Sequence, residues 1–233
     1  MPAQFLLRPF KVLSQTYKHL RHADSSVLSK DERKRAWAEE MLEIMNVDLA
    51  VSGTPTAERP GIFVGNHVSY IDIPLLLAHV PDLSFVAKQE LASWPLFGRG
   101  MRKMDTIFVQ RNSPASRGNA KESLQLALEK ERKAVIIFPS GTTSLHEEQA
   151  WKLGAFRLAE KTGAPLQPFR LTYHPLRPAA FIDDDSFLLH LMKAGRNGRI
   201  RASLEFAPAE IVTDAKAACA RWQKWATRQR LES

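Results

Sequence analysis

Short apolar runs that alternate with helical segments are the feature that most restricts the fold of this chain. Ala134–Phe138 is the most strand-like of these runs, and Ile62–Val64 and Leu83–Ala87 are of the same kind. Strands with several apolar residues in a row are typical of parallel sheets that are covered by helices on both faces. Because the segments between them favour helices, we expect an α/β fold with a mostly parallel central sheet flanked by helices.

The remaining elements follow from the same patterns. Further strands are expected at residues 47–52, 106–109, 164–172 and 200–206, and helices at 31–46, 115–130, 150–162, 186–193 and 214–230. A chain of 233 residues can form one domain with a small appendage. We therefore divide it into an N-terminal amphipathic helical segment, residues 1–46, and an α/β domain, residues 47–233.

Charge and cysteine usage narrow the classes of partner. Lys and Arg number 33 against 25 Asp and Glu, a formal net charge of +8. This excess favours an anionic partner, which can be a nucleic acid, a membrane surface or a phosphorylated substrate. A single cysteine, Cys219, excludes an internal disulfide and agrees with a reducing compartment. The apolar runs are too short for a transmembrane helix.

The N-terminal stretch, residues 4–21, mixes large apolar side chains with Arg and Lys and is interrupted by Pro9. Such a face can lie in a membrane interface with its cations toward anionic headgroups. It can equally form a helix that packs on its own domain with solvated charges. The same choice between core and membrane applies to Trp37, Met41 and Met45 on the next helix.

Polar groups of catalytic type follow the run Ile62–Val64. His67 stands in the expected turn, and Asp72 stands five residues later, where its carboxylate is suited to cap a new helix. An imidazole whose far nitrogen is held by a carboxylate is a general base with a fixed tautomer. The alternative is that both side chains only complete the turn.

Two other strands also end in polar groups. Arg111 follows residues 106–109, and the hydroxyl-rich turn Ser140–Ser144 follows Ala134–Phe138. Because sites in open parallel sheets lie at the carboxyl ends of the strands, His67, Arg111 and the turn should converge. Arg111 can clamp a phosphate, and the turn around Gly141 can hold a phosphate or an oxyanion. Together these groups favour acyl transfer to the hydroxyl of a phosphorylated acceptor.

Four blocks in order carry a family resemblance. Asn66–Asp72 resembles the NHxSxxD block, or HX4D motif, of PlsC-type glycerolipid acyltransferases. Ile107–Arg111, Phe138–Ser144 and Ala164–Pro168 resemble the second, third and fourth blocks of that family, and Lys152–Phe156 resembles its K-x-G-A segment.

The resemblance implies a mechanism and a set of substrates. His67 would be the general base, Asp72 would orient it, and Arg111 would hold an acceptor phosphate. It also implies substrate-binding roles for further residues: Asn66, Ser69, Ser140, Gly141, Thr142 and Thr143. The acyl donor would be acyl-CoA or acyl carrier protein, with no metal or other cofactor, and the first-choice acceptor would be 1-acylglycerol-3-phosphate. We expect the protein to act at an anionic membrane surface, the cytoplasmic face of the inner membrane, as a monotopic or peripheral enzyme.

Three positions depart from the family pattern. The family's third-block Glu is Ser140 here, its third-block Arg is Thr143, and a Gly near the second block is Asp105. In typical members the Glu and Arg help to bind the acceptor. Their absence leaves another lyso-lipid, such as a lyso-aminolipid, as an alternative acceptor.

Two rival functions remain from the residues alone. The first is a thioesterase or hydrolase that uses Ser140 with His67 and Asp72, although Ser140 lacks the G-x-S-x-G elbow. The second is a binder of nucleic acid or lipid through the basic and aromatic last helix, with Trp222 and Trp225. The acyltransferase prediction includes no nucleic-acid partner. A zinc site is disfavoured because His146 lacks the second histidine of HExxH.

Overall fold

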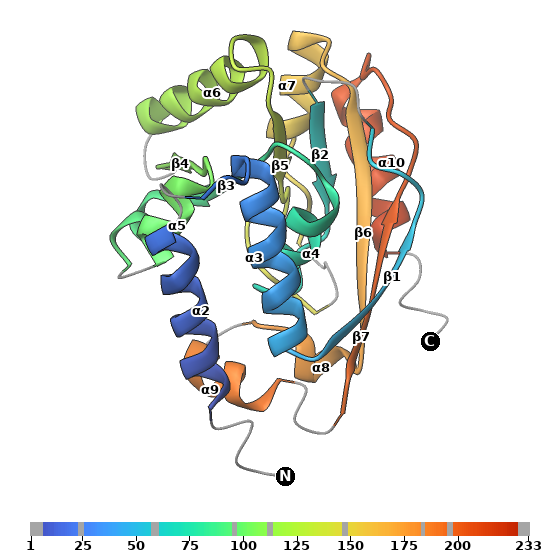
Figure 1. The fold of residues 1–233 in the computed structure, drawn as a ribbon. Coiled ribbons are helices and arrows are strands. Elements are labelled where there is room, and N and C mark those ends of the chain that lie inside the picture. The colour runs from blue at the N-terminus through green and yellow to red at the C-terminus, as the bar shows by residue number, and fades with distance from the viewer. Residues whose placement is uncertain are drawn as a thin grey trace.

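The computed structural model describes residues 7–22, 26–56, 61–94, 97–110, 114–145, 149–182, 185–194 and 198–227. The strands of these described residues form one seven-stranded sheet, in the order β1-β7-β6-β2-β5-β3-β4 (Figure 1). The strands are β1 (Val47–Ser52), β2 (Gly61–Gly65), β3 (Leu83–Lys88), β4 (Ile107–Val109), β5 (Ala134–Ile137), β6 (Leu166–His174) and β7 (Ile200–Phe206). Only the β6–β7 pair is antiparallel, so the prediction of a mostly parallel sheet is confirmed.

Helices cover both faces of this sheet. They are α2 (Arg8–His22), α3 (Lys30–Ile44), α4 (Asp72–His79), α5 (Phe97–Lys103), α6 (Pro114–Glu129), α7 (Gly154–Thr162), α8 (Leu176–Ala179), α9 (Phe187–Lys193) and α10 (Ala215–Thr227), with a 3₁₀ turn at Gln89–Ser93. One core cluster unites the sheet with α3 and α4, and the other unites it with α7 and α10 (Figure 1).

Strand β2 lies at the centre of the sheet and is buried on both faces. Phe63 packs into the α3–α4 cluster, while Ile62 and Val64 pack into the α7–α10 cluster. Side chains that alternate between two apolar layers explain why this strand reads as a continuous apolar run. At its end, a Cβ on Gly65 would meet the Phe169 ring at 2.4 Å, so only glycine fits where β2 passes β6.

The N-terminal helices pack on the sheet domain. Met41 of α3 and Met45, the residue that follows this helix, are buried in the same cluster as α4, so these side chains are core and not membrane-facing. Ser29 and Glu32 form the capping box at the start of α3 that their spacing suggests. The helix α2 contacts α3, α5 and α9. The boundary between residues 46 and 47 stays a prediction.

Several expected boundaries differ from the structure. Pro9 does not interrupt α2, because it lies in the first turn, where a missing N–H costs nothing. Residues 97–103, where no helix was expected, form α5. Helix α7 begins at Gly154 rather than Ala150, and β6 runs two residues further than expected, to His174.

Candidate active site

A cavity of about 470 Å³ lies at the carboxyl ends of the central strands. His67 after β2, Lys88 at the end of β3 and Phe138 after β5 all line it. The rest of its wall is mainly apolar and comes from α2, α3, α5, α9 and the loops between them. These residues include Val12, Met41, Met45, Phe85, Leu91, Met101, Met104, Phe181, Phe187 and Leu191. The cavity thus combines a polar end with a wall that suits a hydrocarbon chain.

His67 and Asp72 form a hydrogen-bonded pair at the polar end. His67 Nδ1 lies 2.7 Å from Asp72 Oδ2, and the Asp72 side chain is fully buried. The carboxylate therefore fixes the imidazole tautomer with the proton on Nδ1 and leaves Nε2 as the basic nitrogen. A histidine held in this way, in the wall of a cavity, is suited to accept a proton from a bound hydroxyl.

The carboxylate of Asp72 does not cap its own helix, contrary to the sequence prediction. Helix α4 begins without a side-chain cap at Ile71, and Asp72 is its first residue. Asp72 Oδ2 instead accepts the backbone N–H groups of Val68 at 2.8 Å and Ser69 at 3.1 Å. The side chain thus closes the preceding loop around itself, which holds His67 and Asp72 as one rigid unit.

Tyr173, which the sequence did not single out, completes this unit. Tyr173 lies on β6, which is far from Asp72 in the sequence. Its hydroxyl donates to Asp72 Oδ1, and its ring is buried. Burial and the adjacent Asp72 carboxylate raise the pKa of Tyr173 well above its ordinary value, so the hydroxyl keeps its proton. Both oxygens of the Asp72 carboxylate are therefore hydrogen-bonded.

The loop after β5 approaches His67 directly. The Phe138 ring stacks on the His67 imidazole, with centroids 3.9 Å apart and planes 12° apart. The Ser144 N–H donates to the His67 carbonyl at 2.9 Å. Because β2 and β5 are parallel neighbours, their following loops meet at one edge of the sheet, as predicted for His67 and the Ser140–Ser144 turn.

Within that turn, only part of the predicted set reaches the cavity. Gly141, Thr142 and Thr143 line it, and Gly141 adopts φ 79°, a conformation that favours glycine. Ser140 is buried and its hydroxyl donates to the Thr142 carbonyl at 2.9 Å. Because this hydroxyl is committed to its own turn, the geometry does not favour Ser140 as the nucleophile of a hydrolase.

Asn66 and Ser69, predicted to bind substrate, are fully buried and are not among the residues that line the cavity. The Asn66 amide donates to the Leu171 carbonyl and accepts from the Leu171 N–H, each at 2.8 Å, so it pins the loop to β6. Ser69 is fully buried, and its hydroxyl has no hydrogen-bond partner among the residues that the structure describes. A direct contact of either side chain with substrate stays a prediction.

Arg111, the predicted phosphate clamp, lies outside the described residues. The strand that precedes it, β4, pairs in parallel with β3 at the edge of the sheet. Lys88, at the end of β3, is a cation that the sequence did not single out and that lines the cavity.

Tyr70, Phe181 and Phe187 form an aromatic part of the cavity wall. The Tyr70 hydroxyl lies 3.0 Å from His190 Nδ1, and the Tyr70 ring meets the rings of Phe181 and Phe187 edge to face. Burial lowers the pKa of His190. Burial also raises the pKa of Tyr70, and the smaller effect of the Arg8 charge in the opposite direction does not cancel this shift. Both side chains are therefore neutral at physiological pH.

The last helix does not present a face of free tryptophans. Trp222 donates to the Glu210 carboxylate at 2.6 Å, and the Arg170 guanidinium stacks on Trp225 with 4.5 Å to the ring centroid. Arg221 is paired with the same Glu210. These contacts anchor α10 to the sheet and do not favour a nucleic-acid surface there. In the part of the chain that the structure describes, no group of three His, Cys, Asp or Glu side chains could hold a metal ion.

Comparisons with known proteins agree with this geometry. A sequence model of the family described as Acyltransferase matches residues 46–172. A lyso-ornithine lipid O-acyltransferase of Pseudomonas aeruginosa is 34% identical over 177 residues, which cover 73% of this chain and 67% of the relative. A second, from Rhizobium meliloti, is 30% identical over 75% of this chain and 65% of its own length.

Other relatives act on a different acceptor. A 1-acyl-sn-glycerol-3-phosphate acyltransferase of Neisseria meningitidis is 34% identical over 70% of this chain and 64% of the relative. The matched region thus spans about two thirds of the length of these curated relatives. The crystal structure of the 1-acyl-sn-glycerophosphate acyltransferase PlsC from Thermotoga maritima has the same fold, with a TM-score of 0.70, 19% identity and coverage of 100% of this chain and 95% of that chain.

Proposed function

The chain belongs to the PlsC-type acyltransferase family, and on this premise we propose that it esterifies the hydroxyl of a lyso-lipid with a fatty acyl group from a thioester. The observation that carries the proposal is the His67–Asp72 pair, 2.7 Å apart, in the wall of a largely apolar cavity. A general base beside a hydrocarbon-binding wall is the arrangement that acyl transfer to a lipid hydroxyl requires.

The proposed reaction proceeds without an acyl-enzyme. His67 Nε2 takes the proton of the acceptor hydroxyl as its oxygen attacks the thioester carbonyl. Asp72, which holds Nδ1, stabilises the imidazolium that results. When the carbon–sulfur bond breaks, the imidazolium returns its proton to the leaving thiolate, and the ester and free thiol are released. The Gly141 N–H donates to the Phe138 carbonyl at 3.0 Å, so we propose that the N–H groups of Thr142 and Thr143, which also line the cavity, stabilise the oxyanion.

For the acceptor, we propose a lyso-aminolipid of the lyso-ornithine type in place of 1-acylglycerol-3-phosphate. Thr143 lines the cavity where the family usually has a phosphate-binding Arg, and the Ser140 hydroxyl is committed to its own turn. Two relatives with names of this kind support the proposal. Ornithine carries a carboxylate and an ammonium group, so its recognition does not need the missing Arg. Transfer to 1-acylglycerol-3-phosphate is the second candidate, favoured by the Neisseria relative.

An acceptor panel tests the proposal. Purified protein in detergent is given labelled acyl-CoA or acyl carrier protein together with lyso-ornithine lipid, 1-acylglycerol-3-phosphate or a lysophosphatidylethanolamine. We expect product with lyso-ornithine lipid, and a gain of 1-acylglycerol-3-phosphate activity in the Thr143→Arg variant. Product with 1-acylglycerol-3-phosphate alone would make the second candidate correct. Thioester hydrolysis without transfer, lost in Ser140→Ala, would instead indicate the hydrolase.

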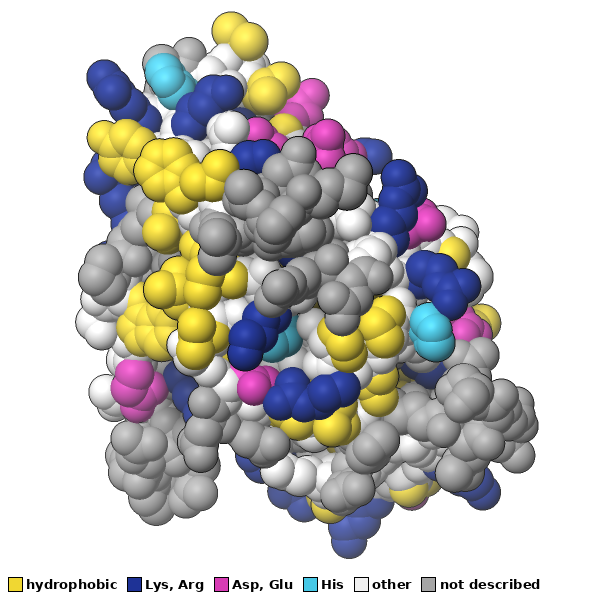
Figure 2. Space-filling view, turned by 90° about the horizontal axis from the view of Figure 1, so that it is seen from below, with side chains coloured by type: hydrophobic (Ala, Val, Ile, Leu, Met, Phe, Trp, Pro, Cys, Tyr) yellow, Lys and Arg dark blue, Asp and Glu magenta, His cyan; other side chains and the backbone are white. Residues whose placement is uncertain are grey.

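We further propose that α2 and α9 dock the enzyme on an anionic membrane. Val12, Thr16 and Leu20 face the protein core or its cavities, and the opposite face of α2 exposes Phe10 at 69% and Tyr17 at 53%. The neighbouring α9 exposes Leu188 and Leu189. Figure 2 views the molecule from this end, where hydrophobic side chains gather among Lys and Arg.

Vesicle binding tests this docking. Large apolar side chains beside cations suit insertion into the headgroup region of anionic lipid. We expect co-sedimentation with phosphatidylglycerol vesicles to fall about tenfold in Phe10→Ala/Leu189→Ala. Full burial of one large apolar side chain stabilises binding by roughly 2 kcal/mol, and each substitution removes part of this free energy. Unchanged sedimentation would contradict the docking face. In the described residues, no helix combines the length and apolarity that a membrane span needs, and the cytoplasmic side stays a prediction.

A further inference from the structure

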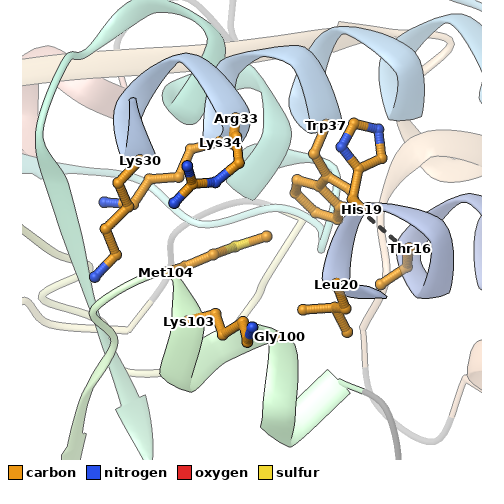
Figure 3. Close-up of a pocket in the computed structure, with 10 residues that line it drawn as sticks. All are labelled: Thr16, His19, Leu20, Lys30, Arg33, Lys34, Trp37, Gly100, Lys103 and Met104. Carbon is orange, nitrogen blue, oxygen red and sulfur yellow. Dashed lines mark hydrogen bonds between the residues drawn. The ribbon is translucent and has the colours of Figure 1, made fainter. Parts of the chain in front are cut away.

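A second cavity, of about 280 Å³, lies between α2, α3 and α5 (Figure 3). Its lining residues are Thr16, His19, Leu20, Lys30, Arg33, Lys34, Trp37, Gly100, Lys103 and Met104. Four of these are Lys or Arg, and none is Asp or Glu. Figure 3 shows the Lys30, Arg33 and Lys34 side chains extending from α3 on the side that faces Met104 and Lys103 of the α5 region. We call this the basic pocket.

The acidic groups around the basic pocket do not balance its charge. Asp105 forms an ion pair with Lys30 and lies 3.8 Å from Lys34 and 3.9 Å from Lys133, which also pairs with Glu131 at 2.6 Å. Asp31 is a second carboxylate that acts on Lys34. The Arg33 guanidinium donates to the Leu28 carbonyl, which is a neutral acceptor. The two carboxylates Asp31 and Asp105 thus stand against four cationic lining residues, and the remaining positive charge suits a phosphate group.

The basic pocket adjoins the catalytic cavity. Thr16, Trp37, Gly100 and Met104 line both of them. His67 lines only the larger cavity, so the basic pocket is separated from the general base by the residues that the two cavities share. An anion bound there must belong to a substrate whose charged group is far from its reacting atom.

That requirement separates the two substrates. In a lysophosphatidic acid, the phosphate lies only a few bonds from the attacked hydroxyl, so its subsite must adjoin His67. In a phosphopantetheine thioester, the whole pantetheine arm separates the phosphate from the thioester sulfur. We propose that the basic pocket binds the phosphate of the phosphopantetheine arm, the group that acyl-CoA and acyl carrier protein share. This inference rests on the proposed acyltransferase function.

A matched pair of donors tests the proposal. Acyl-pantetheine and acyl-4′-phosphopantetheine differ only in the phosphate, and each is supplied with the same lyso-lipid acceptor. We expect wild-type kcat/KM to favour the phosphorylated donor by about ten- to a hundred-fold, as charge-assisted contacts to a phosphate would give. Arg33→Gln/Lys103→Gln should abolish this preference through KM and leave turnover of acyl-pantetheine unchanged.

Arg35→Gln is the control, because Arg35 lies on the same helix but is 66% exposed and outside the basic pocket. It should keep the wild-type preference. A wild-type enzyme that ignores the phosphate, or a double variant that retains the preference, would overturn the proposal, as would equal losses with both donors.

The source of the phosphate is tested with the natural donors. Acyl-CoA and acyl carrier protein should both lose activity in the double variant, and a loss confined to one of them would contradict a shared subsite. If the wild type transfers no acyl group from any donor, the proposed function itself fails, which is a different result.

Discussion

The buried network around Asp72 and the ion cluster around Asp105 are each centred on a single carboxylate, yet the surroundings of the two carboxylates differ. Asp72 is fully buried and accepts from an imidazole, two backbone N–H groups and the Tyr173 hydroxyl. Asp105 is 25% exposed and is surrounded by the ammonium groups of Lys30, Lys34 and Lys133. One carboxylate is held mainly by directional hydrogen bonds, and the other mainly by lysine ammonium groups, two of which lie 3.8 and 3.9 Å away.

This difference indicates different roles. A buried and fully bonded carboxylate fixes the position and tautomer of its partner, and the loss of its charge disturbs everything that it holds. Half-exposed ion pairs are weakened by water and salt and contribute little to stability. Substitutions of Asp72 or Tyr173 should therefore lower the rate of the chemical step. Changes around Asp105 should leave the chemistry intact.

The largest effect is expected from Asp72→Asn. The substitution keeps the shape of the side chain but removes the charge that stabilises the His67 imidazolium, so kcat/KM for acyl transfer should fall by roughly 10²–10⁴-fold. Steady-state transfer to the preferred lyso-lipid measures the loss. Asp48→Asn, on the edge strand β1, is the matched control and should be active. A fall of less than about tenfold in Asp72→Asn would mean that the network does not support the base.

A smaller effect is expected from Tyr173→Phe. The buried Asp72 Oδ1 loses its donor, which should cost about 1–3 kcal/mol in the free energy of unfolding. We expect activity to fall about tenfold, because the carboxylate can still hold His67 through its other oxygen. Urea unfolding and steady-state kinetics measure the two effects. Tyr17→Phe, on the outer face of α2, should change neither stability nor activity. An equal loss of stability in both variants would contradict a stabilising hydrogen bond from Tyr173 to Asp72.

The smallest effect is expected from Asp105→Asn. Burial raises the pKa of the Asp105 carboxyl, but the hydrogen bond from Lys30 and the nearby lysines outweigh it, so the net pKa lies below the ordinary value of 3.8. A lowered pKa in the folded state gives stability that is present above pH 3.8 and is lost as the pH falls through the folded value. Asp105→Asn should therefore be less stable at pH 6, by under about 1 kcal/mol, and the difference should shrink at pH 3.

Urea midpoints at the two pH values measure this, and an equal difference at both would contradict it. Asn is a suitable replacement because residue 105 has φ 58°, which Asn tolerates well. This backbone conformation also gives a physical reason for the Gly that the resembling family usually has here. In this chain, the Asp in that position gains the three lysines as partners.

The sequence predicted the parts of the fold that local pattern controls. The consecutive apolar residues of β2 and β5 identified buried central strands, and their parallel pairing brought His67 and the Gly141 turn together. Pro9 misled the reading of α2, because a proline in the first turn of a helix looks the same in sequence as one that breaks it.

The parts that the sequence missed depend on distant residues. Tyr173 reaches Asp72 from 101 residues away, and no local pattern marks a strand residue whose hydroxyl points into another loop. Asp72 was predicted to cap α4 but is its first residue, and its carboxylate turns back to Val68 and Ser69 because the tight loop supplies closer donors. The basic pocket unites α3 with α5, and only the fold brings these helices together.

Replacement of His67 by Ala tests the central claim most directly. The variant should keep the wild-type circular dichroism and urea midpoint within about 1 kcal/mol but lose acyl transfer by at least roughly 10²-fold. His79→Ala is the control, because His79 is also part-buried, lies on α4 and is outside the catalytic cavity. If folded His67→Ala protein transfers acyl groups at a rate close to that of His79→Ala, His67 is not the general base.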